Sequence, residues 1–160
     1  MIRVAGELFD SLANGPGMRY VLFTQGCKMG CPECQNKHTW SMNGGVLMTY
    51  EEIINHINES PFITGVTLSG GDPIDQAQQT SELCLKIKEE RPDLNIMLYT
   101  GRTLEQLKAL KNKYIETILN TIDYLVDGRF ESDKIEGAST YTGSSNQKIY
   151  DLKKNIEIRF

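Results

Sequence analysis

The fold of this chain is constrained most strongly by four short runs of apolar and β-branched residues. Longer segments with the residue spacing of helices separate these runs. Strands that alternate with helices are joined by right-handed crossovers, and such connections build a parallel sheet. The runs that predict strands are Arg19 to Phe23, Gly65 to Ser69, Asn95 to Tyr99 and Ile122 to Val126.

The segments between those runs contain helix signals. Thr49 and Glu52 have the spacing of a capping box, which predicts a helix that continues through about Asn58. A second helix is predicted over about 75–90, and it stops at Pro92 because proline cannot continue the hydrogen-bond ladder. A third helix is predicted from the spacing of Leu104, Leu107 and Leu110.

Each predicted strand leads directly into a loop that contains glycine. Ligands of parallel sheets bind at the carboxyl ends of the strands, so we expect these loops to gather on one edge. The 160 residues fit a single domain, residues 1–160, but not a closed eight-stranded barrel, which needs about 250 residues. We therefore expect an α/β fold, namely an open, partial (β/α) barrel with a mainly parallel sheet and a final strand or hairpin within 137–160. The loops are the cysteine loop after Phe23, Gly70-Gly71, Thr100-Gly101 and Asp127-Gly128.

Composition and charge exclude several classes of protein. The net charge of −4, from 17 basic and 21 acidic residues, argues against a nucleic acid or an anionic membrane as partner. No apolar run approaches the length of a transmembrane helix, and Met1 to Asp10 lacks the basic start of a secretory signal. We therefore expect a cytoplasmic protein, whose four cysteines form no disulfide framework. Cys84, alone in a helical segment, is expected to be a buried core residue.

The other three cysteines, Cys27, Cys31 and Cys34, have CxxxCxxC spacing. Thiolates are soft ligands that suit iron–sulfur clusters or zinc. A 4Fe–4S cluster usually takes four cysteine ligands, so three would leave one iron open to another molecule. A Cys3His zinc site that includes His38 is the alternative, although closed zinc sites commonly use two separated ligand pairs. An electron-carrying cluster with no open iron would need a fourth cysteine.

This sequence resembles the radical S-adenosylmethionine (SAM) superfamily over nearly its whole length, since CxxxCxxC after the first strand is the signature of that superfamily. Ser69-Gly70-Gly71-Asp72-Pro73 is similar to its glycine-rich motif after the second strand, with Asp72 where Glu is more usual. The resemblance implies a 4Fe–4S cluster on Cys27, Cys31 and Cys34, with SAM bound at the open iron. It also implies that Gly70, Gly71 and Asp72 meet the amino end of SAM.

Further segments resemble one subfamily, the activases of glycyl radical enzymes. Asn14 to Arg19 is similar to their entry segment. Three other segments are similar to the small activating proteins of anaerobic ribonucleoside-triphosphate reductase: Cys34 to Trp40, Leu125 to Phe130 and Gly143 to Gln147.

The subfamily resemblance implies an activating oxidoreductase that cleaves SAM reductively and generates a glycyl radical on that reductase. Its electron donor is not identified by the sequence. One alternative is the activation of another glycyl radical enzyme, such as pyruvate formate-lyase. A second alternative, from a different class, is a zinc-stabilised binding module without catalysis.

The resemblance also implies where the rest of SAM binds. The residue before the third cysteine is often an aromatic beside the adenine in this superfamily, but here it is Glu33. The backbone of Glu33, Cys34 and Gln35 is therefore predicted to contact the adenine. Thr100 and Asp127, at strand ends, are predicted to meet the ribose or the methionine part. No catalytic acid or base is predicted, because the implied chemistry is hydrogen-atom transfer.

Several polar or aromatic residues have more than one interpretation. Asn146 and Gln147 either line the cofactor site or hold the C-terminal tail. Arg19 and Arg129 contact the SAM carboxylate or an acidic partner, or they lie at the surface, which is the default for single arginines. Trp40, the only tryptophan, shields the cluster, contacts the partner or simply covers the core.

Overall fold

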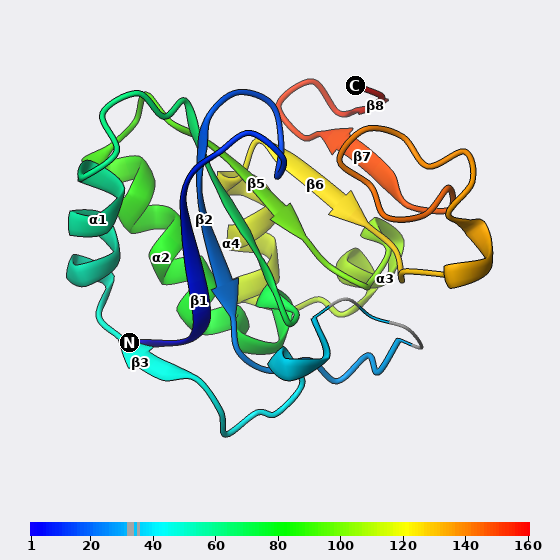
Figure 1. The fold of residues 1–160 in the computed structure, drawn as a ribbon, viewed down its shortest axis with the longest axis horizontal. Helices are drawn as coiled ribbons and strands as arrows, with labels where there is room; N and C mark the ends of the chain where they lie inside the picture. The colour runs from blue at the N-terminus through cyan, green and yellow to red at the C-terminus, as the bar shows by residue number, and fades with distance from the viewer. Residues whose placement is uncertain (32–33, 35) are drawn as a thin grey trace.

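A computed structural model describes residues 1–31, 34 and 36–160 of the chain (Figure 1). Its strands form one 8-stranded sheet in the order β3-β1-β2-β4-β5-β6-β7-β8. Within the described residues β3 and β8 have no further strand beside them, so the sheet is open. The strands are β1 (Ile2–Ser11), β2 (Arg19–Thr24), β3 (Val46–Met48), β4 (Gly65–Gly70), β5 (Asn95–Tyr99), β6 (Tyr124–Asp127), β7 (Lys148–Asp151) and β8 (Ile156–Ile158).

The central strands β2, β4, β5 and β6 are parallel to one another. In the first of these pairs Arg19 lies opposite Gly65, and Thr24 lies opposite Gly70. These are the strands that the sequence predicts. Central parallel strands are buried on both faces, so they read as nearly continuous apolar runs that are easy to recognise.

Antiparallel strands flank this centre on both sides, and the expectation of a mainly parallel sheet is wrong in this respect. β1 pairs antiparallel with β2 and with β3, while β7 pairs antiparallel with β6 and with β8. The sequence does not predict β1, because its second half is largely exposed and lacks a continuous apolar run. The β7–β8 hairpin agrees with the final hairpin expected within 137–160. The fold is therefore mixed α/β with an open sheet.

The first two helices follow their sequence signals. α1 (Tyr50–Asn58) begins with the predicted capping box, in which Thr49 and Glu52 exchange side-chain-to-backbone hydrogen bonds. α2 (Ala77–Glu90) is preceded by a 3-10 turn, η2 (Pro73–Gln76), so it starts slightly later than expected.

The third predicted helix is two helices. α3 (Leu104–Ala109) ends early, and Lys111 adopts a positive φ of 48°. The side chain of Asn112 then accepts hydrogen bonds from the first N–H groups of α4 (Lys113–Thr121). Short 3-10 helices lie at η1 (Lys37–Thr39) and η3 (Ser132–Lys134). Among the described residues, no helix is long and apolar enough to cross a membrane.

Helices cover one face of the sheet and bury the main core against it (Figure 1). A row of four paired leucines crosses the central strands on this face, and all are at most 1% exposed. Isoleucines and leucines of α1, α2 and α4 pack into the same core. The row is Leu22, Leu68, Leu98 and Leu125.

The opposite face of the sheet holds a buried arginine. Arg19 is 0% exposed, so the default expectation of a surface position is wrong. Its guanidinium donates to Oγ1 of Thr67 at 2.7 Å, to the carbonyl of Pro16 at 2.8 Å and to the carbonyl of Val66 at 2.9 Å. Burial lowers the pKa of Arg19 to about 10, so it remains charged at neutral pH. Arg19 thus holds the preceding loop at the amino end of the central strands, opposite to the cysteine end.

Candidate functional site

The loops after β2 and β4 lie against each other at the carboxyl edge of the parallel strands. The N–H of Gly71 donates to the carbonyl of Thr24 at 2.9 Å, and the N–H of Asp72 donates to the carbonyl of Gly26 at 2.9 Å. A Cβ on Gly71 would collide with the backbone of Gly26, and Gly70 has a positive φ of 105° beside the Thr24 backbone. Both glycines are therefore required by this packing. Their contact with SAM stays a prediction.

The three loop cysteines line a common hollow of about 230 Å³ at this edge, which we call the cysteine hollow. Cys31 is buried, whereas Cys27 and Cys34 are partly exposed. Pro32, Glu33 and Gln35 lie outside the described residues, so the predicted adenine contacts of Glu33 and Gln35 do as well. Around the cysteines the hollow is lined by Met29, Asn36, Thr39, Trp40, Ser69, Gly70, Gly71, Asp72, Tyr99, Thr100, Gly101, Gly128, Phe130, Gly143 and Gln147.

Two hydrogen bonds tie the cysteine loop to distant parts of the chain. The N–H of Lys28 donates to Oδ2 of Asp75 at 2.9 Å. Nη2 of Arg129 donates to the carbonyl of Met29 at 2.6 Å. Lys28 and Met29 both lie between the first two cysteines of the motif. This part of the loop is therefore held by Asp75 in η2, which precedes α2, and by Arg129 in the loop after β6.

Asp72 is at the centre of a buried polar network. Its Oδ1 accepts from the N–H of Ile74 at 3.0 Å. Its Oδ2 accepts from Oγ1 of Thr100, the N–H of Gly101 and Nη1 of Arg102, each at 3.0 Å. Burial raises the pKa of Asp72, and this effect outweighs the hydrogen bonds and the arginine, which lower it. The four donors match the roughly four acceptor positions of a carboxylate.

Two residues of this network are not predicted from the sequence. Nη2 of Arg102 lies 2.7 Å from Oδ1 of Asp75, whose other oxygen accepts from Lys28. Arg102 therefore connects the glycine turn at Asp72 with the cysteine loop. The only sequence signal for Arg102 is its position directly after Thr100-Gly101, and an arginine in a loop is too common to single out.

Three cysteines around one hollow suit an iron–sulfur cluster, because thiolates are soft ligands. Among residues 1–31, 34 and 36–160, no three His, Cys, Asp or Glu side chains are grouped so as to hold one metal ion. His38 is exposed and does not line the cysteine hollow, which disfavours the Cys3His zinc alternative. Cluster thiolates bind different irons, so they need only surround a common space.

One further observation agrees with a bound group in this hollow. Nε1 of Trp40 is buried without a hydrogen-bond partner in the described structure. Burial raises the pKa of Cys27, which by itself favours the neutral thiol. Cys84 is different: it is fully buried in the core under α2, where burial raises its pKa to about 12, as expected for a structural cysteine.

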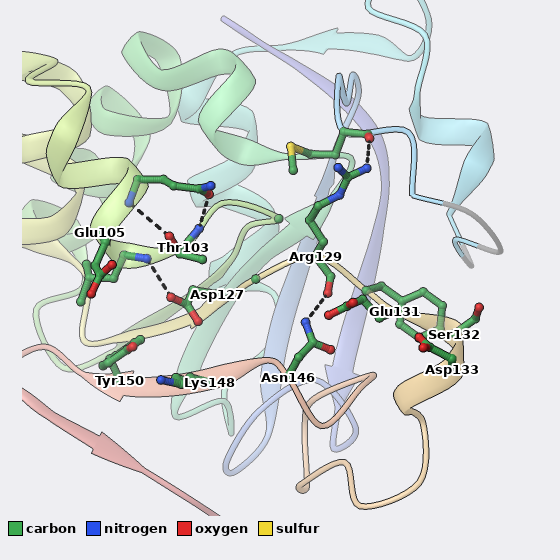
Figure 2. A pocket seen from close by; sticks show the side chains of 16 residues that line it. Thr103, Glu105, Asp127, Arg129, Glu131, Ser132, Asp133, Asn146, Lys148 and Tyr150 are labelled. Carbon is green, nitrogen blue, oxygen red and sulfur yellow. Dashed lines mark hydrogen bonds between the residues drawn. The ribbon is translucent and has the colours of Figure 1, made fainter.

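A larger hollow of about 890 Å³ adjoins the cysteine hollow, and the two share Met29, Gly101, Gly128 and Phe130. Figure 2 shows the polar residues around it. Asp127 lies here and not in the cysteine hollow, and its Oδ2 accepts from the N–H of Leu104 at 2.7 Å, at the start of α3. The structure thus gives Asp127 a role in holding a helix, and its contact with SAM stays a prediction.

Asn146 and Gln147 hold the C-terminal tail, and each also lines a hollow. Nδ2 of Asn146 donates to the carbonyl of Arg129 at 2.8 Å (Figure 2), and Nε2 of Gln147 donates to the carbonyl of Gly128 at 3.0 Å. Gln147 lines the cysteine hollow, whereas Asn146 lines the larger one. The two interpretations of these residues are therefore compatible.

Comparison with known proteins identifies the class of this domain. A family model described as a 4Fe-4S single cluster domain matches residues 13–150. The chain therefore belongs to the 4Fe–4S single cluster domain family, as the cysteine hollow indicates.

Full-length relatives identify the family more narrowly. The chain is 38% identical to an anaerobic ribonucleoside-triphosphate reductase-activating protein of Salmonella typhi over 148 residues, 89% of this chain and 94% of the relative. Proteins of the same name are 36% identical in Escherichia coli strain K12, over 89% of this chain and 94% of the relative, and 34% identical in Enterobacteria phage T4, over 86% of each. This chain belongs to the family of anaerobic ribonucleoside-triphosphate reductase-activating proteins, and the resemblance inferred from the motifs is confirmed.

Among solved structures, QueE from Escherichia coli matches with a TM-score of 0.48 and 18% sequence identity. The match covers 64% of this chain and 53% of QueE. A likeness at this level bears on neither the fold nor the function.

Proposed function

We propose that this chain is a radical SAM activase that cleaves SAM at a 4Fe–4S cluster and generates a glycyl radical on anaerobic ribonucleoside-triphosphate reductase. The observation that carries the proposal is that Cys27, Cys31 and Cys34 line one hollow together with the glycine turn of the next parallel strand. The names of the relatives support the choice of partner. In this proposal the open sheet is the partial barrel of the radical SAM superfamily.

The chain's own residues would hold the cluster and leave one iron free for SAM. When bound, the cluster supplies the electron that splits SAM into methionine and a 5′-deoxyadenosyl radical, which takes a hydrogen atom from the target glycine. The hydrogen bonds to the backbone of Lys28 and Met29 would hold the loop that carries Cys27 and Cys31 beside the glycine turn. Apolar and aromatic side chains that line the hollow, including Tyr99, would limit the access of water to the radical.

The proposed SAM contacts take into account which polar atoms the described hydrogen bonds leave available. Gly70 and Gly71 bring backbone atoms to the wall of the hollow without side chains. Asp72 and Thr100 already use their side-chain atoms in the buried network, so we propose that they hold the turn and the strand end in place for SAM. Asp127 would act from the neighbouring hollow, and Glu33, Cys34 and Gln35 would contact the adenine.

An electron paramagnetic resonance experiment tests this proposal. The reconstituted chain is mixed anaerobically with SAM, dithionite as a substitute for the unidentified electron donor, and the reductase. We expect the signal of a glycyl radical on the reductase with the wild-type chain and with Cys84→Ala, and no signal with Cys34→Ala. A signal on pyruvate formate-lyase but not on the reductase would contradict the proposed partner and favour the alternative activase.

A further inference from the structure

Trp40 has a buried hydrogen-bond donor that the described part of the chain leaves without a partner. Its Nε1 is shielded from solvent, and no described acceptor lies within hydrogen-bond distance. An indole N–H can only donate, and buried tryptophans normally find an acceptor for it. A buried donor left unsatisfied in this way calls for an acceptor that binds beside it, either a bound group or a water molecule.

The position of Trp40 narrows the choice of that group. Trp40 lines the cysteine hollow, and its carbonyl accepts a hydrogen bond from the N–H of Cys27 at 3.2 Å. One residue earlier, the carbonyl of Thr39 accepts from the N–H of Gly26 at 2.6 Å. The tryptophan backbone is thus fixed alongside the first cysteine of the motif.

The segment that leads to Trp40 already donates one hydrogen bond to a cysteine sulfur. The N–H of Asn36 donates to Sγ of Cys34 at 3.4 Å, at the start of the short helix η1 that leads to Trp40. On the outer side, Nζ of Lys37 lies 6.0 Å from the centre of the indole ring, where a cation is attracted to its face. The segment from Asn36 to Trp40 therefore brings hydrogen-bond donors to the cysteine hollow.

We propose that Nε1 of Trp40 donates a hydrogen bond to a sulfur atom of the cluster, a thiolate or a sulfide, and thereby raises the reduction potential of the cluster. The inference rests on the proposed function, because it requires a cluster on Cys27, Cys31 and Cys34. Reduction adds negative charge to the cluster sulfurs, so a donor stabilises the reduced state more than the oxidised state. Trp40 would then help to make the cluster reducible.

The test is the midpoint potential of the reconstituted cluster, measured by anaerobic redox titration with electron paramagnetic resonance detection. Trp40 is replaced by Phe and, by unnatural amino-acid incorporation, by 3-benzothienylalanine, which keeps the shape of the indole but has sulfur in place of N–H. Each protein is titrated with and without SAM. Tyr50→Phe is the matched control, because it removes an aromatic donor that contacts Glu82 outside the site.

We expect both Trp40 variants to lower the equilibrium constant for one-electron reduction by about tenfold, a shift of about 59 mV to lower potential. The shift should appear without SAM, and Tyr50→Phe should leave the potential unchanged. Three results would overturn the inference: unchanged potentials in both variants, a shift with Phe but not with 3-benzothienylalanine, or a shift only in the presence of SAM, which would place the acceptor on SAM. A wild-type chain that assembles no cluster would instead overturn the proposed function.

Discussion

Nη1 of Arg102 lies 3.0 Å from Oδ2 of Asp72, a carboxylate that is only 1% exposed. Through its other terminal nitrogen, the same guanidinium reaches Asp75, which accepts the N–H of Lys28 in the cysteine loop. One arginine side chain therefore stabilises the glycine turn and the cysteine loop together. This connection lies entirely within the protein, so its contribution is measurable without any cofactor.

Replacing Arg102 with Leu should destabilise the chain strongly. The substitution leaves the carboxylate of Asp72 buried without its cation, and breaking a buried ion pair in this way typically costs about 3–5 kcal/mol. Because the Arg102 side chain is 21% exposed, we expect a cost near the lower end of that range. The measurement is anaerobic urea unfolding of the apoprotein.

A matched control for Arg102 is Arg91, which has a similar exposure of 23% but lies 2.9 Å from Asp93, a carboxylate that is 60% exposed. Surface pairs contribute about 0–1 kcal/mol, so Arg91→Leu should cost far less than Arg102→Leu. Equal losses of unfolding free energy in the two variants would show that Asp72 does not depend on Arg102.

Arg19→Lys should destabilise the chain although it conserves the charge. The guanidinium of Arg19 donates from Nε and both terminal nitrogens to Thr67, Pro16 and Val66, whereas an ammonium is a single point donor. We expect a loss of about 2 kcal/mol in the free energy of urea unfolding, since at least one buried acceptor is left without a donor. A loss below about 0.5 kcal/mol would contradict the role assigned to this residue.

The pair of His56 and Glu7 should make stability depend on pH. Nδ1 of His56 lies 2.7 Å from Oε1 of Glu7, and this hydrogen bond raises the pKa of His56. The folded state then binds the proton more tightly than the unfolded state. The resulting stabilisation is fully present below the ordinary pKa of about 6.5 and disappears as the pH rises through the raised value.

His56→Gln isolates this effect from every other titrating group. The difference in unfolding free energy between wild type and variant should be largest near about pH 5.5 and smallest near about pH 8.5. Urea unfolding at a series of pH values provides the measurement. A difference that stays constant over this range would mean that the proton on His56 does not contribute to stability.

The carboxylate of Asp127 should matter as an acceptor for the N–H of Leu104, not as a charge. Asp127→Ala removes a hydrogen bond at the start of α3, and losses of this kind cost about 1–2 kcal/mol. Asp127→Asn keeps an oxygen that can accept, and burial already raises the pKa of Asp127, so we expect less than half that cost. Thermal or urea unfolding that ranks Asn as the more damaging substitution would contradict this interpretation.

The central part of the fold can be predicted from the sequence, because its strands and helices have strong local signals. The strands around Leu22, Leu68, Leu98 and Leu125 are buried on both faces, and Thr49 begins α1 with a complete capping box. The outer strands β1 and β3 lack such signals, since both are partly exposed and depend on their partners for pairing. The antiparallel flanks follow from tertiary pairing, which local propensity does not describe.

The residues of the candidate site also differ in whether the sequence predicts them. The meeting of the cysteine loop with Gly70-Gly71 can be predicted, because both follow parallel strands and the carboxyl ends of such strands share one edge. The roles of Arg102 and Asp75 cannot be predicted from the sequence, because they depend on a contact between two residues that are 27 positions apart. The burial of Arg19 cannot be predicted either. Nothing near it in the sequence indicates that Thr67 and Val66 accept hydrogen bonds from its guanidinium.

The most direct test of the central claim is the amount of 5′-deoxyadenosine formed when each reconstituted variant is incubated anaerobically with dithionite and SAM. The wild-type chain and Cys84→Ala should form it, and Cys27→Ala, Cys31→Ala and Cys34→Ala should not. Formation at the wild-type level by any of the three loop variants, or its loss in Cys84→Ala, would contradict a cluster held by these three thiolates with one iron open to SAM.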